Sequence, residues 1–165
     1  DLFLIKPMSM LFRALVGGAD PIDLFMLIPY IGSLVYVGRL LGPAPIINIG
    51  LYIILVCNSL FIAASFHILV LALAILTTEI DHAIMIYRDL TMMGRVPVDI
   101  YREPLRSIMT FVIPVGVMMT FPVKIFLGLL SPIWAVVSFG LGVIFFLICL
   151  RIWRFALSRY ASASS

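Results

Sequence analysis

The sequence predicts an all-α integral membrane protein with about four transmembrane helices, further interfacial helices and a short outer re-entrant helix. Hydrophobic residues make up 64% of the 165 residues and charged residues only 12%, whereas soluble domains contain about 45–50% apolar residues. Several apolar runs reach the roughly 20 residues that a helix needs to cross about 30 Å of hydrocarbon. Because backbone groups in lipid must be bonded internally, these runs indicate helices.

Proline marks the start of each expected span, because its missing N–H costs nothing in the first helical turn. Asp20-Pro21-Ile22-Asp23 adds an N-cap and a carboxylate at the positive end of the helix dipole. The spans are expected at residues 21–41, 45–76, 104–121 and 132–153. The second would be about 48 Å long and must tilt, bend or protrude.

The segments between the spans are expected at the membrane surfaces. Residues 1–19 form a cytoplasmic segment with a short interfacial helix, and residues 80–103 form a cytoplasmic loop with an amphipathic helix. Residues 122–131 are too short to cross again and predict an outer re-entrant segment. The chain starts with Asp1 rather than Met, so we expect a single transmembrane domain that lacks its N-terminal part.

Two prolines interrupt the region of the third expected span. Pro114 is expected to bend the helix, and Gly116 to allow a neighbouring helix to approach closely. Pro122 is expected to end the span at the outer surface, with Lys124 extending its ammonium group toward water. The bend at Pro114 is either incidental or a functional feature of a moving span.

The distribution of cations predicts that both ends of this segment are cytoplasmic. That orientation leaves Arg39 and Lys124 outside and places nine cations inside: Lys6, Arg13, Arg88, Arg95, Arg102, Arg106, Arg151, Arg154 and Arg159. The net charge of +3 is too small and too dispersed for a nucleic-acid-binding surface.

The sequence contains no pattern typical of catalysis or of a cofactor. It lacks G-x-x-x-x-G-K-[ST] and H-E-x-x-H, and no Asp or Glu lies inside an apolar run. We therefore expect no enzymatic activity, no metal site and no cofactor, with any ATP bound by another subunit. The missing buried carboxylates also disfavour a proton- or sodium-coupled carrier.

Three polar residues in the second span are candidates for a translocation pathway: Asn58, Ser65 and His67. Asn58 and Ser65 share a helix face, whereas His67 lies about 180° around the helix from Asn58. They either face a pathway or form hydrogen bonds between helices.

Three stretches together resemble the permease subunits of bacterial ATP-binding-cassette (ABC) transporters of the type-2 exporter class. They are "DLFLIKPMSMLFRAL", "GRVPVDIYREPLRSIMTFVIPVGVMMTFP" and "WRFALSRYASASS", in an order and spacing that cover essentially the whole chain. The resemblance implies a multi-pass protein of the bacterial cytoplasmic membrane and the C-terminal portion of a six-span permease. It also points to a re-entrant element between the last two spans.

The same resemblance implies how the protein works. A permease dimer, made of two copies or of two related chains, would enclose the pathway, and a separate ATPase subunit would drive it. Lys6, Pro7, Phe12 and Arg13 would contact that ATPase, although an interfacial helix that merely anchors the chain remains the alternative. A non-transporting scaffold subunit and a secondary carrier are the alternative functions.

Overall fold

The computed structural model describes residues 11–12, 21–77 and 80–163. The regular elements within these residues are all helical, which confirms the predicted all-α membrane fold. In chain order they are α2 (Pro21–Leu41), α3 (Ile46–Thr77), α4 (Ile80–Met93), η1 (Val98–Ile100), α5 (Leu105–Ser107), η2 (Ile108–Val112), α6 (Val115–Met119), α7 (Phe121–Phe126) and α8 (Ile133–Ala163).

Three helices in the described part of the chain are long and apolar enough to cross a membrane: α2, α3 and the Ile133–Arg159 part of α8. The bounds of α2 equal the first predicted span, and those of α3 differ from the second by one residue at each end. Helix α8 starts one residue later than predicted but continues to Ala163. The chain is thus a multi-pass membrane protein.

The chain divides into two compact units, residues 1–45 and residues 46–165. In the first unit, α2 has Asp23 in its first turn and Arg39 in its last, as the helix dipole favours. It ends at Gly42, whose positive φ of 86° is a conformation that glycine adopts without steric cost.

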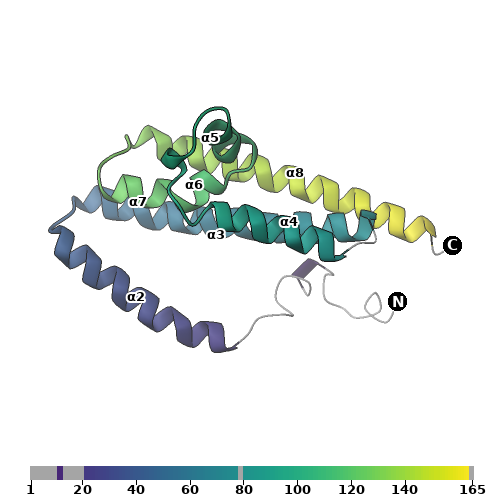
Figure 1. Ribbon diagram of the computed structural model, residues 1–165, viewed down its shortest axis with the longest axis horizontal. Coiled ribbons are helices and arrows are strands. Elements are labelled where there is room, and N and C mark those ends of the chain that lie inside the picture. Colours follow the sequence, from purple (N-terminus) through teal and green to yellow (C-terminus); the bar gives the residue numbers. More distant parts are fainter. Residues whose placement is uncertain (1–10, 13–20, 78–79, 164–165) are drawn as a thin grey trace. The chain divides into compact units, whose positions relative to one another are not determined.

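In the second unit, α3 and α8 lie side by side and run in the same direction (Figure 1). The contacts advance together along both helices: Asn58 Nδ2 donates to the carbonyl of Ser138 at 3.0 Å, and Phe66 packs on Phe145 with ring centroids 4.7 Å apart. A contact that advances in step along two helices defines a parallel pair.

The chain between these two helices returns along α3 in pieces (Figure 1). Helix α4 follows α3 after two residues and packs against it. Further along, Ser59 Oγ of α3 donates to the carbonyl of Met118 in α6 at 2.7 Å. Tyr52 then meets Phe126 of α7 at 5.6 Å between ring centroids. Because α3 numbers fall as the return numbers rise, α6 and α7 run antiparallel to α3.

The predicted third span, residues 104–121, is wrong as a continuous helix. The chain there forms α5 and η2, leaves helical geometry at Ile113 (φ −114°, ψ 88°) and resumes as α6 after Pro114. Proline lacks an N–H and disfavours helical geometry in the residue before it, which explains a break rather than a bend. Pro122 lies in the first turn of α7, so it begins a helix instead of ending one.

Residues 94–114 fold back against α6, and we call them the folded-back segment. Gly116 makes this possible: a Cβ there would lie 3.0 Å from Val98 Cγ2 and 3.1 Å from the carbonyl of Met109. The close approach expected at Gly116 is therefore made by this segment rather than by another span. Val98 and Met109 are buried in the same cluster as Val115 and Phe121.

A single small residue also controls the α3–α8 contact. Asn58 is 3% exposed, and its Oδ1 accepts no hydrogen bond from the described residues. A Cβ added at Gly142 of α8 would overlap that oxygen. Close helix contact at a small residue is a common way for membrane helices to associate.

We predict that Gly142→Ala destabilises the protein by about 1–3 kcal/mol, the usual cost of overpacking. Gly140→Ala is the matched control, because among the described residues no atom outside the helix's own neighbouring backbone lies within 4 Å of a Cβ at that position. Thermal unfolding in detergent should show a lower midpoint for Gly142→Ala alone. An equal midpoint for both variants would contradict the packing described here, and adding Asn58→Ala should recover part of the loss.

Candidate functional site

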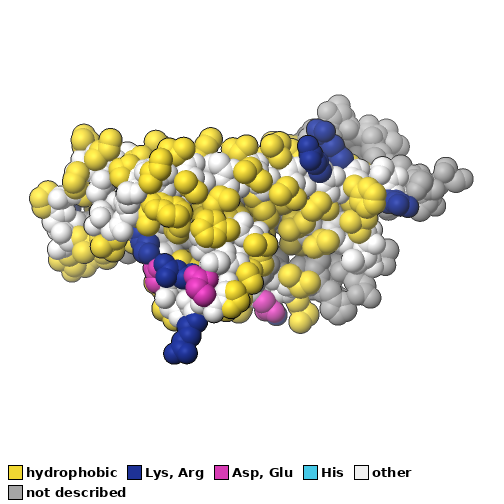
Figure 2. All heavy atoms as spheres, turned by 90° about the horizontal axis from the view of Figure 1, so that it is seen from above, with side chains coloured by type: hydrophobic (Ala, Val, Ile, Leu, Met, Phe, Trp, Pro, Cys, Tyr) yellow, Lys and Arg dark blue, Asp and Glu magenta, His cyan; other side chains and the backbone are white. Residues whose placement is uncertain are grey.

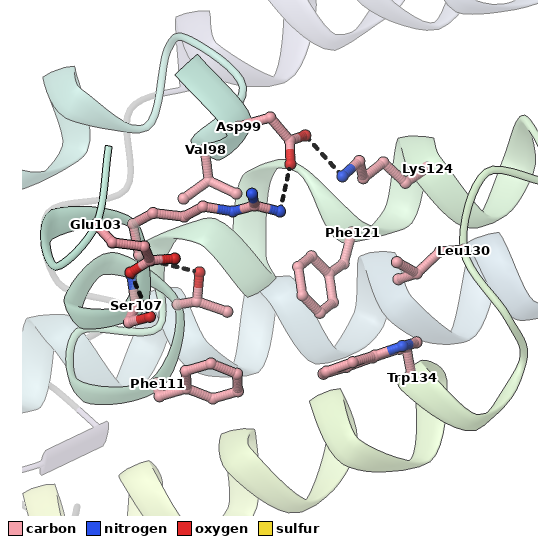
Figure 3. Close-up of a pocket in the computed structure, with 11 residues that line it drawn as sticks. Val98, Asp99, Glu103, Ser107, Phe111, Phe121, Lys124, Leu130 and Trp134 are labelled. Atoms are coloured by element: carbon pink, nitrogen blue, oxygen red, sulfur yellow. Dashed lines mark hydrogen bonds and ion pairs between the residues drawn. The ribbon is translucent and has the colours of Figure 1, made fainter. Parts of the chain in front are cut away.

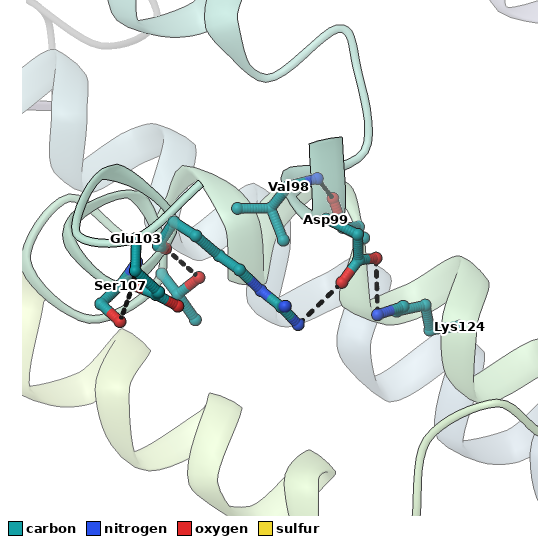
Figure 4. A network of polar contacts seen from close by, with 8 residues as sticks. Val98, Asp99, Glu103, Ser107 and Lys124 are labelled. Atoms are coloured by element: carbon teal, nitrogen blue, oxygen red, sulfur yellow. Dashed lines mark hydrogen bonds and ion pairs between the residues drawn. The ribbon is translucent and has the colours of Figure 1, made fainter. Parts of the chain in front are cut away.

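Asp99 joins two cations that come from different segments. Its carboxylate accepts from Arg106 Nη2 at 2.9 Å and from Lys124 Nζ at 2.6 Å. Pro97 precedes the single turn η1, and the N–H of Val98 donates to Thr120 Oγ1 at 3.1 Å (Figure 4). This bond fixes η1 beside the start of α7, so that the Asp99 side chain reaches Lys124.

The Lys124 ammonium group, by its hydrogen bond, holds the pKa of Asp99 below its usual value. Partial burial opposes this shift, while the charges of Lys124 and Arg106 reinforce it. The side chains remain partly exposed, at 36% for Asp99, 23% for Lys124 and 47% for Arg106. Exposed pairs contribute little each to the free energy of unfolding, but these pairs connect η1, the helical turn at Arg106 and α7.

A second carboxylate stabilises the turn that carries Arg106. Glu103 Oε2 accepts from the backbone N–H of Ser107 at 3.1 Å and also from the Ser107 hydroxyl (Figure 4). An acidic oxygen that accepts from a first-turn N–H satisfies a donor that has no partner within the helix. The residue thereby orients Arg106 toward Asp99.

These charged side chains line a pocket of about 260 Å³ with a polar and an apolar side. Figure 3 shows Asp99 and Lys124 on one side of it and the rings of Phe121 and Trp134 on the other. The two rings pack edge to face, with centroids 5.9 Å apart. Eleven residues line the pocket: Val98, Asp99, Glu103, Arg106, Ser107, Thr110, Phe111, Phe121, Lys124, Leu130 and Trp134.

Asp99 and Lys124 also border a second pocket of about 310 Å³. Its other charged residue is Arg95, and the rest of the lining is largely apolar, including Met119, Val123 and Leu127. The ion pair therefore separates two hollows. On the face shown in Figure 2, charged side chains gather in small groups within a surface that is mainly hydrophobic.

The structure corrects the predicted partition of cations. Arg106 was expected inside and Lys124 outside, but both contact Asp99 and must lie at the same end of the second unit. Arg95 borders the pocket beside Lys124 and belongs to that end too. The nine-to-two count fails because the folded-back segment and α7 reach one location.

The three polar residues of α3 do not converge. Asn58 and Ser65 are buried, and Ser65 Oγ donates to the carbonyl of Phe61 in its own helix at 2.8 Å. His67 is exposed, with Nδ1 at 2.9 Å from the carbonyl of Ala63. Asn58 bonds across to α8, which favours the helix-contact interpretation for that residue.

The expected ATPase contacts lie mostly outside the described residues. Lys6, Pro7 and Arg13 are not among the described residues, whereas Phe12 lies in a described helical stretch, residues 11–12. Among the described residues, no group of three or more His, Cys, Asp or Glu side chains could hold a metal ion.

Sequence reasoning missed Asp99, Glu103 and Trp134 as members of one site. A signal was present: two carboxylates and two arginines, Asp99, Arg102, Glu103 and Arg106, immediately precede an apolar run, where charges mark a function or an interface. The pairing with Lys124 carries no local signal, because it joins positions 25 residues apart.

We predict that cysteines at Arg102 and at Leu129, both exposed, react with an impermeant thiol reagent from the same side of the membrane. A cysteine at Ser158, near the other end of α8, should react only from the opposite side. The background variant has Cys57 and Cys149 replaced by alanine. Labelling of positions 102 and 129 from opposite sides would contradict the placement of the folded-back segment.

A second prediction concerns pH. A carboxylate whose folded pKa is lowered stabilises the fold above its unfolded pKa of about 3.9 and loses this contribution as pH falls through the folded value. Asp99→Asn should thus lower the thermal midpoint at pH 6 by a small amount, since pairs of this kind are worth about 0.2–1 kcal/mol each. The difference from the parent should shrink below about pH 4.

Asp89→Asn, at an exposed carboxylate of α4 outside the cluster, serves as the control. The same loss at every pH would show that Asp99 acts through its shape and not through its charge.

The model of one protein family, described as ABC-2 family transporter protein, matches residues 1–164. No curated protein and no solved structure matches the chain.

Proposed function

We propose that this chain, which belongs to the ABC-2 transporter family and is thus a permease component of an ABC transporter, is the membrane-spanning subunit of an export system. It would line the translocation pathway and couple to a separate ATPase subunit. The observation that carries the proposal is the family match over the whole chain, joined to three helices long and apolar enough to span a membrane.

The location of charges in α3 and α8 supports a permease driven by a partner over an ion-coupled carrier. Helix α3 contains no Lys, Arg, Asp or Glu over its 32 residues. In α8 the first such residue is Arg151. A carrier driven by protons or sodium commonly uses ionisable groups inside its spans. Helices without such groups are better explained if a partner subunit that binds ATP supplies the energy.

The proposed assembly contains two permease chains, either two copies or two related proteins, in the bacterial cytoplasmic membrane. ATP binding to the partner would act by contacting the inward- and outward-facing states with different affinity. We place the end of α8 with Arg151, Arg154 and Arg159 in the cytoplasm, since three cations close behind a span favour that side. Asp99 and Lys124 are then on the outer side.

Residues 1–19 are the proposed contact with the ATPase, through Lys6, Pro7, Phe12 and Arg13. The two cations Lys6 and Arg13 can pair with acidic groups of a partner protein, which is an interaction that charge reversal abolishes. The alternative, a segment bound only to lipid headgroups, predicts weaker membrane association instead of a lost partner.

The test is co-purification of the permease with its ATPase in mild detergent. The double variant Lys6→Glu/Arg13→Glu should reach normal abundance in the membrane and lose the ATPase, with loss of ATP-dependent export. Arg102→Glu, a reversal at an exposed loop position, is the matched control and should retain the subunit. Retention by the double variant would reject residues 1–19 as the contact, and a parent protein that never retains an ATPase would favour a scaffold.

A further inference from the structure

The pocket beside Asp99 combines charged side chains of both signs with aromatic rings. It has two cations, Arg106 and Lys124, and two carboxylates, Asp99 and Glu103. Opposite them stand the rings of Phe111, Phe121 and Trp134 (Figure 3). A ligand that fits such a lining carries charges of both signs at one end and is apolar at the other.

The charged groups retain bonding capacity beyond their contacts with one another. Arg106 pairs with Asp99 through one nitrogen, and Lys124 through its ammonium. A guanidinium group has five N–H donors and an ammonium group three, so both can bind a second anion beside Asp99. A phosphate group, with several oxygens, is a suitable one.

Glu103 provides the opposite charge. Its Oε2 accepts from Ser107, and no ion pair to it is formed by the described residues. A carboxylate offers about four lone-pair sites, so Glu103 can accept further hydrogen bonds. A primary ammonium group satisfies it through both charge and N–H donation.

The pocket lies beside the first turn of α8, where a candidate membrane span begins. Trp134 is the second residue of α8, and the following residues are free of charge as far as Leu150. Tryptophan is enriched at the headgroup level, because its ring is apolar and its N–H is polar. The volume of about 260 Å³ suits a headgroup rather than a whole lipid.

We propose that this pocket binds the headgroup of a phospholipid that carries a primary amine, such as phosphatidylethanolamine. Arg106 and Lys124 bind the phosphate and Glu103 binds the ammonium. The glycerol and the first part of the acyl chains lie on Phe111, Phe121 and Trp134. Binding at this site requires only that the chain lies in the membrane and does not require export. A negative result for lipid binding would therefore leave the proposed export function untouched, and the reverse holds as well.

The test uses Trp134 as reporter, in a variant whose other tryptophans, Trp153 included, are replaced by phenylalanine. The protein is reconstituted without ATP in phosphatidylcholine bilayers that contain increasing fractions of one brominated lipid, which quenches nearby tryptophan. Brominated phosphatidylethanolamine should quench Trp134 at a several-fold lower fraction than brominated phosphatidylcholine or phosphatidylglycerol. Equal quenching by the three lipids would overturn the proposal.

Variants test which residue binds the amine of the headgroup and which binds its phosphate. Glu103→Gln keeps an oxygen for Ser107 and should remove the preference for the amine, a loss of about tenfold, as expected for a charge-assisted hydrogen bond. Lys124→Gln should weaken binding of all three phospholipids, and Lys124→Arg should restore it. Arg102→Gln is the matched control, at an exposed cation that does not line the pocket.

Two further outcomes decide the matter. If soluble phosphoethanolamine relieves the quenching at low millimolar concentration, the ligand is a soluble amino-phosphate and the lipid proposal is wrong. If brominated phosphatidylethanolamine quenches Trp134 of the Glu103→Gln variant as strongly as in the parent, and the thermal midpoint is unchanged, Glu103 does not contact the ligand. The assignment of the amine to Glu103 then fails.

Discussion

The need to satisfy backbone N–H and C=O groups determines how residues 94–132 fold. An irregular segment beside membrane helices is tolerated only where its polar groups find partners in protein or water. Here the N–H of Ile113 bonds to the carbonyl of Ile108 at 2.9 Å, and that of Met118 to the carbonyl of Pro114 at 3.0 Å. Thr120 supplies a side-chain acceptor for Val98. The break at Pro114 is therefore absorbed by contacts within the second unit.

This requirement explains why the sequence predicted some helices well and one segment badly. Residues 21–41 and 45–76 are mainly apolar, begin with a proline and are followed by a glycine or a polar residue, and these signals are local. Residues 104–121 are as apolar as a span, but their side chains are apolar because Met109 and Val115 enter a protein core. Composition cannot distinguish a residue that faces lipid from one that faces protein.

The site was harder to predict than the fold for the same reason. Lys124 was selected from the sequence, yet its partner Asp99 belongs to a different segment and was assigned to the other side of the membrane. The positive-inside rule counts cations in loops, so it fails when two segments that appear separate in sequence meet at one end. The polar residues of α3 show the same limit, because Asn58 is buried and His67 is exposed although both lie on one long apolar helix.

Two contacts of the second unit, the one at Asn58 and the ion pairs of Asp99, differ in how easily they separate. Asn58 is enclosed between α3 and α8 with Gly142 against its oxygen, so a relative shift of these helices must break close packing. The ion pairs of Asp99 are partly exposed, and water can replace them at a cost of about 1 kcal/mol or less each. Breaking these ion pairs would separate the folded-back segment from Lys124 of α7. Helices α6 and α7 would remain joined to α3 through the Ser59–Met118 hydrogen bond and the Tyr52–Phe126 ring contact. The weakest connection in the second unit is therefore the one between the folded-back segment and α7.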